Sequence, residues 1–263
     1  IKDGAEIAAI ERAAAALDAG HNAALGNWRP GLTELEASAI LEDGHRRAGH
    51  EGVFFIRQPD FSMGRGPLAS GDNIDRISGV IFAISGVGLS AAVPAGAARR
   101  VIAAGDLVVV DIPVCVDGYH GDQTRTYCLG QPSEKLRQVY GRLHRTADSL
   151  IADIKPGMTS GEVFEAAISH AEGQGIGETF LAFRDGGRAH FVGHGVGLEL
   201  NEPPLLSRGG GEEIQTGMVL AIELHLCDPE AGTIKLEDMV VVEDGGCRIL
   251  TRSPRELAVI DRV

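Results

Sequence analysis

One stretch of the sequence constrains the fold more than any other, and it reads DLVVVDIPVCVDGYHGDQTRTY from Asp106 to Tyr127. Leu107 to Val110 is continuously apolar and mostly β-branched, as is typical of a strand covered on both faces. The dipeptide Asp117-Gly118 is a strong hairpin signal, so the chain is predicted to fold back there. Asp111 interrupts the apolar run, and a buried carboxylate is costly unless something pairs with it.

Two aspartates of this hairpin are predicted to lie on one face of the sheet. A two-residue turn places Asp111 opposite Thr124 and Asp122 opposite Pro113. Facing residues share a side of a sheet, as do residues two apart on a strand, so the two carboxylates are diagonal neighbours. The pair could hold one charged object between them. A solvated hairpin face explains the pair equally well, and a shift of register by one residue would separate them.

A second hairpin is predicted near the end of the chain. Gly217–Leu226 and Thr233–Val242 read as strands, joined by a turn-rich connector over Cys227–Gly232. A hairpin centred on this connector makes Glu223 face Glu237. Like charges directly opposite each other destabilise a sheet, so this pair also calls for a cation.

A fifth candidate ligand is His194, which stands between Gly193 and Gly195, where the backbone can approach another group closely. A histidine beside glycine is usually a turn residue, and that alternative stays open. Together with four carboxylates, however, one imidazole makes a hard ligand set suited to Mn, Fe(II), Co or Zn. Bridging carboxylates would hold two such ions about 3.5–4 Å apart and activate a shared hydroxide.

The sequence also contains an internal repeat. Two segments, RPGLTELEASAILEDGHRRAG and KPGMTSGEVFEAAISHAEGQG, share a basic-Pro-Gly-aliphatic-Thr start with Glu three residues after the Thr, which is a capping box. Each follows a helical stretch and precedes strands, which predicts two pseudo-symmetric α-then-β halves, about 1–130 and 131–263, in one α+β domain. Duplicated halves would place both hairpins in one sheet. The capping boxes are Thr33/Glu36 and Thr159/Glu162, and the preceding helical stretches are Glu6–Leu25 and Glu134–Ile154.

Composition narrows the class of protein. The 263 residues are 44% hydrophobic and 23% charged, which is ordinary for a globular protein, and the net charge of −13 argues against a nucleic-acid partner. No apolar run has the length of a membrane span, and no secretory leader is visible. The four cysteines show no CxxC spacing, which predicts reduced thiols in a cytoplasmic protein.

The five candidate ligands resemble the dinuclear metal site of the methionine aminopeptidase, prolidase and aminopeptidase P family. The matching segments are VVVDIPVCVDGYHGDQTRT, GHGVGLELNEPP, GMVLAIE and IKLEDMVVV. The resemblance implies an α+β "pita-bread" fold, with two pseudo-symmetric halves around a curved antiparallel sheet. The opening IKDGAEIAAIERAAAALD looks like the start of the catalytic domain of Xaa-Pro peptidases, where a separate N-terminal domain comes first. We therefore expect residues 1–263 to be one catalytic domain of a longer protein. The implied metal ligands are Asp111, Asp122, His194, Glu223 and Glu237.

The sequence departs from the family pattern around the expected substrate. The family's PHG-like segment looks like VPAG here, with Ala95 in place of histidine, and HEPP appears as NEPP with Asn201. A third family histidine is kept as His190. Strand parity suggests two histidines as substitutes for the missing ones, and the alternative for both is a rim position hydrogen-bonded to water. These two are His120 and His225.

The resemblance implies a dinuclear metal-dependent hydrolase, closest to a Xaa-Pro dipeptidase or aminopeptidase acting through a metal-bridging hydroxide. We expect two divalent ions (Mn, Co, Fe or Zn), a small peptide or other small amide as substrate, a homodimer, and no nucleic-acid or membrane partner. A creatinase-like or lyase-like non-peptidase is the alternative that the altered histidines favour, and a catalytically silent binding module is a third. The expected roles are proton shuttle for Glu223, carbonyl or oxyanion binding for His190, and support of the ligands for Thr124 and for Lys235, which replaces the usual arginine.

Overall fold

The computed structural model describes residues 1–56, 65–78 and 84–261. Its helices begin where the capping residues predict. The side chain of Thr33 accepts the N–H of Glu36, the side chain of Thr159 accepts the N–H of Glu162, and both glutamates close the box by accepting the N–H of the threonine. The expected helical stretches are therefore confirmed. The α-helices are α1 (Gly4–Asn27), α2 (Glu34–Arg47), α3 (Glu134–Asp153) and α4 (Ser160–Gly173).

The strands in the described residues form two larger sheets and one small ladder. The first sheet has the order β1-β2-β5-β11, the second has the order β10-β9-β8-β6-β7, and β3 pairs only with β4. All pairs are antiparallel except β11 with β5. A short 3₁₀-helix, η1 (Gly71–Asn73), follows β1. The strands are β1 (Leu68–Ser70), β2 (Leu107–Asp111), β3 (Val114–Val116), β4 (Tyr119–Gly121), β5 (Thr124–Leu129), β6 (Phe191–Gly195), β7 (Glu202–Ser207), β8 (Val219–Asp228), β9 (Gly232–Glu243), β10 (Gly246–Ile249) and β11 (Ala258–Ile260).

The register predicted for the first hairpin is confirmed. Asp111 pairs with Thr124, and Val116 pairs with Tyr119 across the predicted turn. The turn residues Asp117 and Gly118 have positive φ angles of 52° and 76°, which is the backbone that a two-residue hairpin of this type requires. The hydrogen-bonded ladder of this hairpin has two separate parts. β2 pairs with β5 at the open end, and β3 pairs with β4 next to the turn.

The second hairpin is also confirmed, with Glu223 directly opposite Glu237. Its connector is shorter than expected, because the ladder continues to the pair Asp228 and Gly232. The carboxylate of Asp228 explains this tight closure, since its Oδ1 accepts the N–H groups of Glu230 and Ala231.

The expectation that both hairpins lie in one hydrogen-bonded sheet is wrong. The β2–β5 pair belongs to the first sheet and the β8–β9 pair to the second. Side chains make the junction instead: Thr126 Oγ1 donates to the Lys235 carbonyl at 2.7 Å and accepts the Lys235 N–H at 3.0 Å. A shared sheet therefore no longer supports duplicated halves, and their equivalence stays a prediction that superposition would test.

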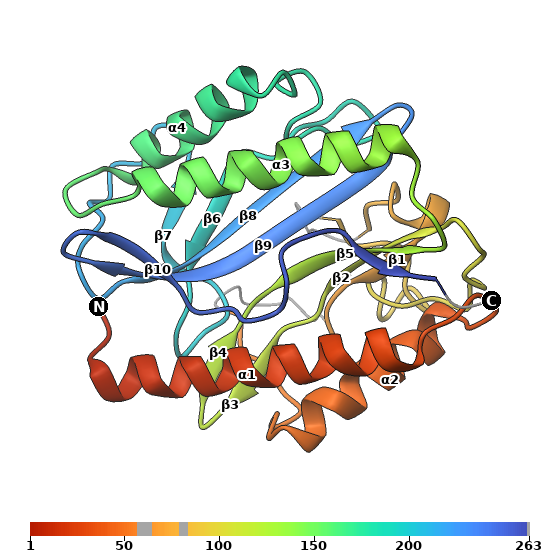
Figure 1. Cartoon of the computed structure of the whole chain (residues 1–263). Coiled ribbons are helices and arrows are strands. Elements are labelled where there is room, and N and C mark those ends of the chain that lie inside the picture. The colour runs from red at the N-terminus through yellow and green to blue at the C-terminus, as the bar shows by residue number, and fades with distance from the viewer. Residues whose placement is uncertain (57–64, 79–83, 262–263) are drawn as a thin grey trace.

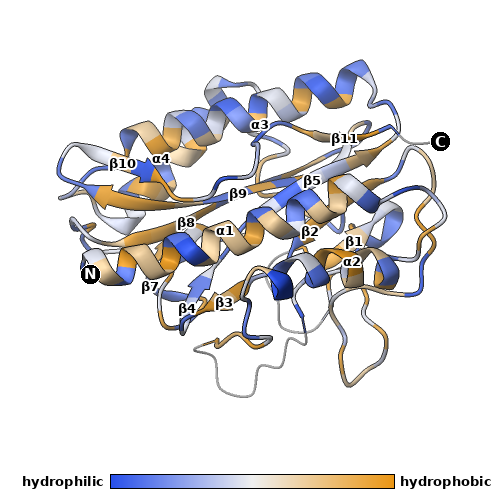
Figure 2. Ribbon diagram, turned by 60° about the horizontal axis from the view of Figure 1, so that its bottom comes forward, coloured by the Kyte–Doolittle hydropathy of each residue, from blue (hydrophilic) through white to orange (hydrophobic). Residues whose placement is uncertain are grey.

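The helices cover the strands from two sides and thereby decide where polar residues can lie. Helices α3 and α4 lie on one side of β8 and β9, while α1 and α2 lie toward the other (Figure 1). Figure 2 shows hydrophilic and hydrophobic bands alternating along α3, as expected of a helix with one buried face. Leu220 and Ile222 of β8 pack in the same core as α3 and α4, whereas Val219 and Ala221 pack with α1. Because side chains alternate along a strand, Glu223 follows on the α1 side.

Two further expectations concern membranes and thiols. None of the helices in the described ranges has the length and apolarity that crossing a membrane requires. Cys115, Cys128, Cys227 and Cys247 all lie in described segments and are free.

Candidate metal centre

The ends of the first hairpin's strands position its two aspartates. Asp111 is the last residue of β2, and its N–H donates to the carbonyl of Pro67 at 2.8 Å. Asp122 lies in the break between β4 and β5, is 4% exposed, and its N–H contacts the sulfur of Met239 on β9 at 3.3 Å. Asp122 lies where the ladder is interrupted, so its N–H is free to contact the second hairpin.

His194 lies within strand β6 rather than in a turn, and its two glycine neighbours are required there. A Cβ at Gly193 would lie 2.0 Å from the carbonyl oxygen of Ala221, and one at Gly195 would lie 2.5 Å from that of Pro203. His194 Nδ1 is 3.0 Å from the carbonyl oxygen of Gly195. Because a carbonyl only accepts, Nδ1 is the protonated nitrogen and Nε2 is left as the ligand atom.

Three of the five predicted ligands form one compact buried group. Asp122, His194 and Glu237 each offer a ligand atom within 4.8 Å of the others. His194 Nε2 is 3.6 Å from Asp122 Oδ2 and 3.5 Å from Oε1 of Glu223, which borders the group. Two carboxylates and one imidazole, all buried, match the donors that divalent transition metals take from proteins. These residues therefore fit one divalent ion.

The ammonium of Lys235 lies close to the other two predicted ligands, Asp111 and Glu223, and also near Glu237 of the compact group. Lys235 Nζ is 2.6 Å from Asp111 Oδ2, 2.8 Å from Glu223 Oε2 and 3.5 Å from Glu237 Oε2. Its side chain is 2% exposed. Strand parity correctly places Lys235 opposite His225 and on the face of Glu237. The ammonium lies among the predicted ligands themselves, not behind them.

Burial and crowding of like charges set the protonation of the centre. Burial, and then the charge of Asp111, raise the pKa of Asp122 to about 7. Burial, with Asp122 beside it, also raises the pKa of Glu237 well above its usual range. For Glu223 burial acts upward, but the charges of Lys235 and His194 outweigh it and lower the pKa. The pKa values of these three buried carboxylates thus shift in different directions, upward for Asp122 and Glu237 and downward for Glu223.

Two side chains of β5 form hydrogen bonds to Glu237, one to its carboxylate and one to its backbone. Thr124 Oγ1 donates to Glu237 Oε2 at 2.6 Å. Arg125, which the sequence analysis missed, is 1% exposed and donates from Nη1 to the carbonyl of Glu237 at 2.6 Å and from Nη2 to Asp238 Oδ1 at 2.6 Å. The sequence could have indicated this role, because Arg125 lies inside a buried strand and Asp238, directly after Glu237, offers it an opposite charge. Arg125 thereby fixes the backbone at Glu237, one of the predicted ligands.

Comparison with known proteins identifies the family. Residues 8–244 match the model of metallopeptidase family M24. The chain belongs to this family. It is 32% identical over 261 residues to the uncharacterized peptidase YqhT of Bacillus subtilis, covering 99% of this chain and 64% of that protein. It is 31% identical over 258 residues to the Xaa-Pro dipeptidase of Pyrococcus furiosus, covering 98% and 64%.

Solved structures agree with this assignment. The dipeptidase PepE from Mycobacterium ulcerans superposes with a TM-score of 0.81 at 29% identity, over 100% of this chain and 62% of that one. The prolidase from Pyrococcus furiosus superposes with a TM-score of 0.77 at 30% identity, over 97% and 66%. The predicted α+β pita-bread fold is therefore confirmed. The chain spans less than two thirds of the length of YqhT, PepE and the Pyrococcus dipeptidase.

The two altered positions of this M24 chain, and the histidine that it keeps, lie outside the strands. Ala95 is buried, and a Cβ at the next residue, Gly96, would lie 3.3 Å from the carbonyl oxygen of Gly66. A Cβ at Gly66 would in turn lie 2.8 Å from the carbonyl oxygen of Asp111. Asn201 is half-buried and directly precedes β7. His190 is exposed and directly precedes β6, the strand that carries His194.

The two proposed substitute histidines are held within the protein. His120 is fully buried, its Nε2 accepts the N–H of Phe55 at 2.8 Å, and its Nδ1 faces the carbonyl of Gly197 at 3.0 Å. Both ring nitrogens of His120 are therefore hydrogen-bonded to backbone groups, which argues against a role in binding the substrate. His225 is stacked on Phe183, and its Nε2 is buried without a hydrogen-bond partner among the described residues. Burial, with the charge of Lys235, lowers the pKa of His225 to about 4.

Proposed function

We propose that this protein is a metal-dependent peptidase of the Xaa-Pro dipeptidase or aminopeptidase type, acting as a cytoplasmic homodimer on small peptides. The observation that carries the proposal is the buried group of Asp122, His194 and Glu237 in an M24 chain. The printed names of several relatives, among them the Xaa-Pro dipeptidase of Pyrococcus furiosus, support the substrate class. The metal is Mn, Co, Fe or Zn, which the donor set accepts without distinction.

The residues of the centre have different roles in amide hydrolysis. Asp122, His194 and Glu237 would hold a divalent ion, which would supply Lewis acidity toward the carbonyl and lower the pKa of a water molecule. Glu223 borders this group, with Oε1 3.5 Å from His194 Nε2, and takes a proton from the attacking water and delivers it to the nitrogen of the leaving amine. His190, exposed at the start of β6, donates a hydrogen bond to the substrate carbonyl and to the oxyanion.

Turnover of Xaa-Pro dipeptides by the full-length, metal-loaded protein tests this function. Glu237→Ala should abolish turnover and bound metal together. Glu243→Ala is the matched control, because Glu243 lies on the same strand but is exposed and pairs with Arg248. Metal retained in stoichiometric amount by the double variant Asp111→Ala/Glu237→Ala after dialysis would contradict the assignment of the centre.

A second candidate is a non-peptidase, creatinase-like or lyase-like, that acts on another small substrate. It is favoured by Ala95 and Asn201 at two family histidine positions, combined with the buried, backbone-bonded ring of His120. Losing one positioned acid or hydrogen-bond donor costs about 10²- to 10⁴-fold in rate. We therefore expect Xaa-Pro turnover well below about 1 per second, which is the low end of ordinary enzymes.

Restoring the family residues distinguishes these two candidates. Ala95→His combined with Asn201→His should raise Xaa-Pro turnover if the chain is a weakened peptidase. Unchanged turnover, in a variant that folds and binds metal normally, would favour the non-peptidase. Turnover by the unmutated protein within the ordinary range of enzymes would show that the expected loss of rate is wrong.

A further inference from the structure

The guanidinium of Arg125 lies at the junction of the two sheets, next to the proposed ligand Glu237. The side chain of Arg125 is 1% exposed. Its Nη1 donates to the carbonyl of Thr124 on β5 at 2.9 Å and to the carbonyl of Glu237 on β9 at 2.6 Å. The same two residues are joined by the bond from Thr124 Oγ1 to Glu237 Oε2. One nitrogen of Arg125 thus connects the backbones of the two hairpins beside a proposed ligand.

The shape of the guanidinium explains why an arginine suits this junction. Strands β5 and β9 belong to different sheets, so side chains make the contacts that a backbone ladder would make within one sheet. An arginine has five N–H donors in a rigid plane, and Arg125 uses all five. A lysine has three donors at a single point on a flexible chain, and it cannot reproduce this set of bonds.

Two of these donors bind the segment that follows β10. Arg125 Nε donates to the carbonyl of Pro254 at 2.9 Å, and Nη2 donates to the carbonyl of Ser253 at 2.9 Å. This segment, residues 251–255, lies beyond residues 8–244, the part of the chain that matches the family model. Arg125 therefore joins three elements: the two hairpins and a segment near the end of the chain.

Asp238 holds the guanidinium in this position. Its Oδ1 accepts from Arg125 Nη2 and from Thr251 Oγ1, both at 2.6 Å, and its Oδ2 accepts from Arg255 Nε at 2.6 Å. The side chains of Arg125 and Asp238 are each 1% exposed. A buried ion pair is weak evidence for stability, because the cost of desolvation offsets the attraction between the charges. The arrangement of this pair is better suited to aligning the two sheets.

We propose that Arg125, held by Asp238 and by residues 251–255, is a positioning residue of the metal centre. It sets how the first hairpin meets the second at Glu237, and metal affinity depends on this alignment. The inference rests on the proposed metal centre and adds residues that are not ligands. Loss of a group that orients a metal ligand typically lowers metal affinity by about 10- to 100-fold, and we expect a loss of this size here.

Metal affinity tests the inference without relying on activity. The full-length protein is stripped with chelator and titrated with Mn²⁺ by calorimetry, after circular dichroism has shown that each variant is folded. Arg125→Lys keeps the positive charge but loses the planar set of donors, and should bind Mn²⁺ about 10- to 100-fold more weakly. If Arg125 only stabilised the fold, the folded variant would bind Mn²⁺ as tightly as the unmutated protein.

Two further variants complete the design. Arg125→Met combined with Asp238→Asn removes both buried charges together, which avoids leaving one charge unpaired if Arg125→Lys does not fold. This double variant should show the same loss of affinity. Arg100→Lys is the matched control, because Arg100 forms ion pairs with Asp72 and Asp106 instead of bonding to the backbone of a proposed ligand. The control should keep its affinity for Mn²⁺.

The outcomes separate this inference from the proposed function. Unchanged Mn²⁺ affinity in folded Arg125→Lys, or in the folded double variant, would overturn the inference and leave the metal centre standing. An equal loss of affinity in Arg100→Lys would also overturn it, because the effect would then not be specific to the junction. If the unmutated protein bound no Mn²⁺ even at excess metal, the proposed metal centre would be wrong, and this inference with it.

Discussion

At the scale of single residues, the hydroxyl of Thr124 on the first hairpin contacts Glu237, a proposed ligand on the second. It donates to Glu237 Oε2 at 2.6 Å, both side chains are almost completely buried, and the bond joins two different sheets. Hydrogen bonds of this kind fix the orientation of a metal ligand, and their loss typically costs about 10- to 100-fold in metal affinity.

Thr124→Val should therefore weaken metal binding by about 10- to 100-fold while leaving the fold intact, because valine has the shape of threonine without the hydroxyl. Calorimetric titration with Mn²⁺ measures the change. Thr126→Val is the matched control: Thr126 lies on the same strand and is equally buried, but it bonds the backbone of Lys235. The control should lose stability and keep its affinity. Equal losses of affinity in both variants would show that Thr124 has no special role.

Residue-level predictions from the sequence succeeded where strand parity decides and failed where side-chain reach decides. Parity placed Thr124 opposite Asp111, and this pairing is confirmed. The hydroxyl nevertheless bonds to Glu237. This contact could not be predicted, because the local sequence pattern does not say how the two hairpins lie against each other. Parity also placed Lys235 opposite His225, but where the ammonium of a long, flexible side chain lies depends on which carboxylates surround it.

At the scale of elements, helices α1 and α2 approach each other at two glycines. A Cβ at Gly44 would lie 2.8 Å from the carbonyl oxygen of Ala19 and 2.9 Å from the Cβ of Ala23. A Cβ at Gly20 would lie 2.1 Å from the buried ring of His45. Since backbone atoms of a packed helix cannot yield locally, the absence of a side chain at Gly44 sets the distance between these helices.

Gly44→Ala should lower the free energy of unfolding by about 1–3 kcal/mol, because the clash with α1 exceeds the gain in helix propensity. Denaturant unfolding followed by circular dichroism measures it. Gly26→Ala in α1 is the control, since nothing lies within 4 Å of the added Cβ, and it should be neutral or raise stability by up to about 1 kcal/mol. A Gly44→Ala variant as stable as the control would contradict the steric argument.

The elements themselves were largely predictable because their signals are local. The capping boxes give the starts of α2 and α4, and the Asp117-Gly118 turn sets the register of the first hairpin. The division into two sheets was not predictable. Strands β5 and β9 are joined by the Thr126 hydroxyl, which bonds the backbone of Lys235, and local sequence signals do not show this. Strand β11, which pairs in parallel with β5 from the far end of the chain, has only three residues and gave no periodic signal.

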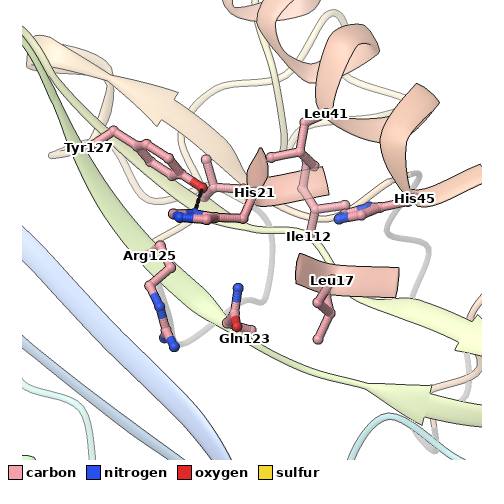
Figure 3. A pocket seen from close by; sticks show the side chains of 9 residues that line it. Leu17, His21, Leu41, His45, Ile112, Gln123, Arg125 and Tyr127 are labelled. Carbon is pink, nitrogen blue, oxygen red and sulfur yellow. Dashed lines mark hydrogen bonds between the residues drawn. The ribbon is translucent and has the colours of Figure 1, made fainter. Parts of the chain in front are cut away.

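At the scale of the whole molecule, a small cavity beneath α1 and α2 gathers two buried histidines (Figure 3). His21 Nδ1 is 2.8 Å from the hydroxyl of Tyr127, and Figure 3 shows this contact beside Arg125. Burial, with the charge of Arg125, lowers the pKa of His21 to about 4, although Asp18 opposes the shift. Burial, with His50 nearby, lowers the pKa of His45 to about 3.

The stability of the protein should therefore fall as the pH falls from about 6.5 toward 4. Over this range the unfolded chain takes up protons on both histidines, whereas the folded chain keeps them neutral. Each histidine accounts for on the order of 3 kcal/mol by the low end of this range. Denaturant unfolding at pH 7, 5.5 and 4.5 measures the slope.

Variants at both positions isolate this contribution from that of the carboxylates. His21→Gln with His45→Gln should flatten the dependence of unfolding free energy on pH. His170→Gln, at a half-buried position on α4, removes a histidine outside this cavity and serves as the control. A slope that is identical in all three proteins would mean that other groups cause the loss of stability.

The ammonium of Lys235 also bears on the order in which the protein matures. In small metal-dependent domains the ion is part of the folding reaction, and the chain stays unfolded until it arrives. Here the facing pair of Glu223 and Glu237 brings its own counter-charge on the same hairpin, two residues from one of the carboxylates. We therefore expect the hairpin to form without the ion, because the ammonium offsets the repulsion between the two carboxylates. The metal-free protein should then be folded.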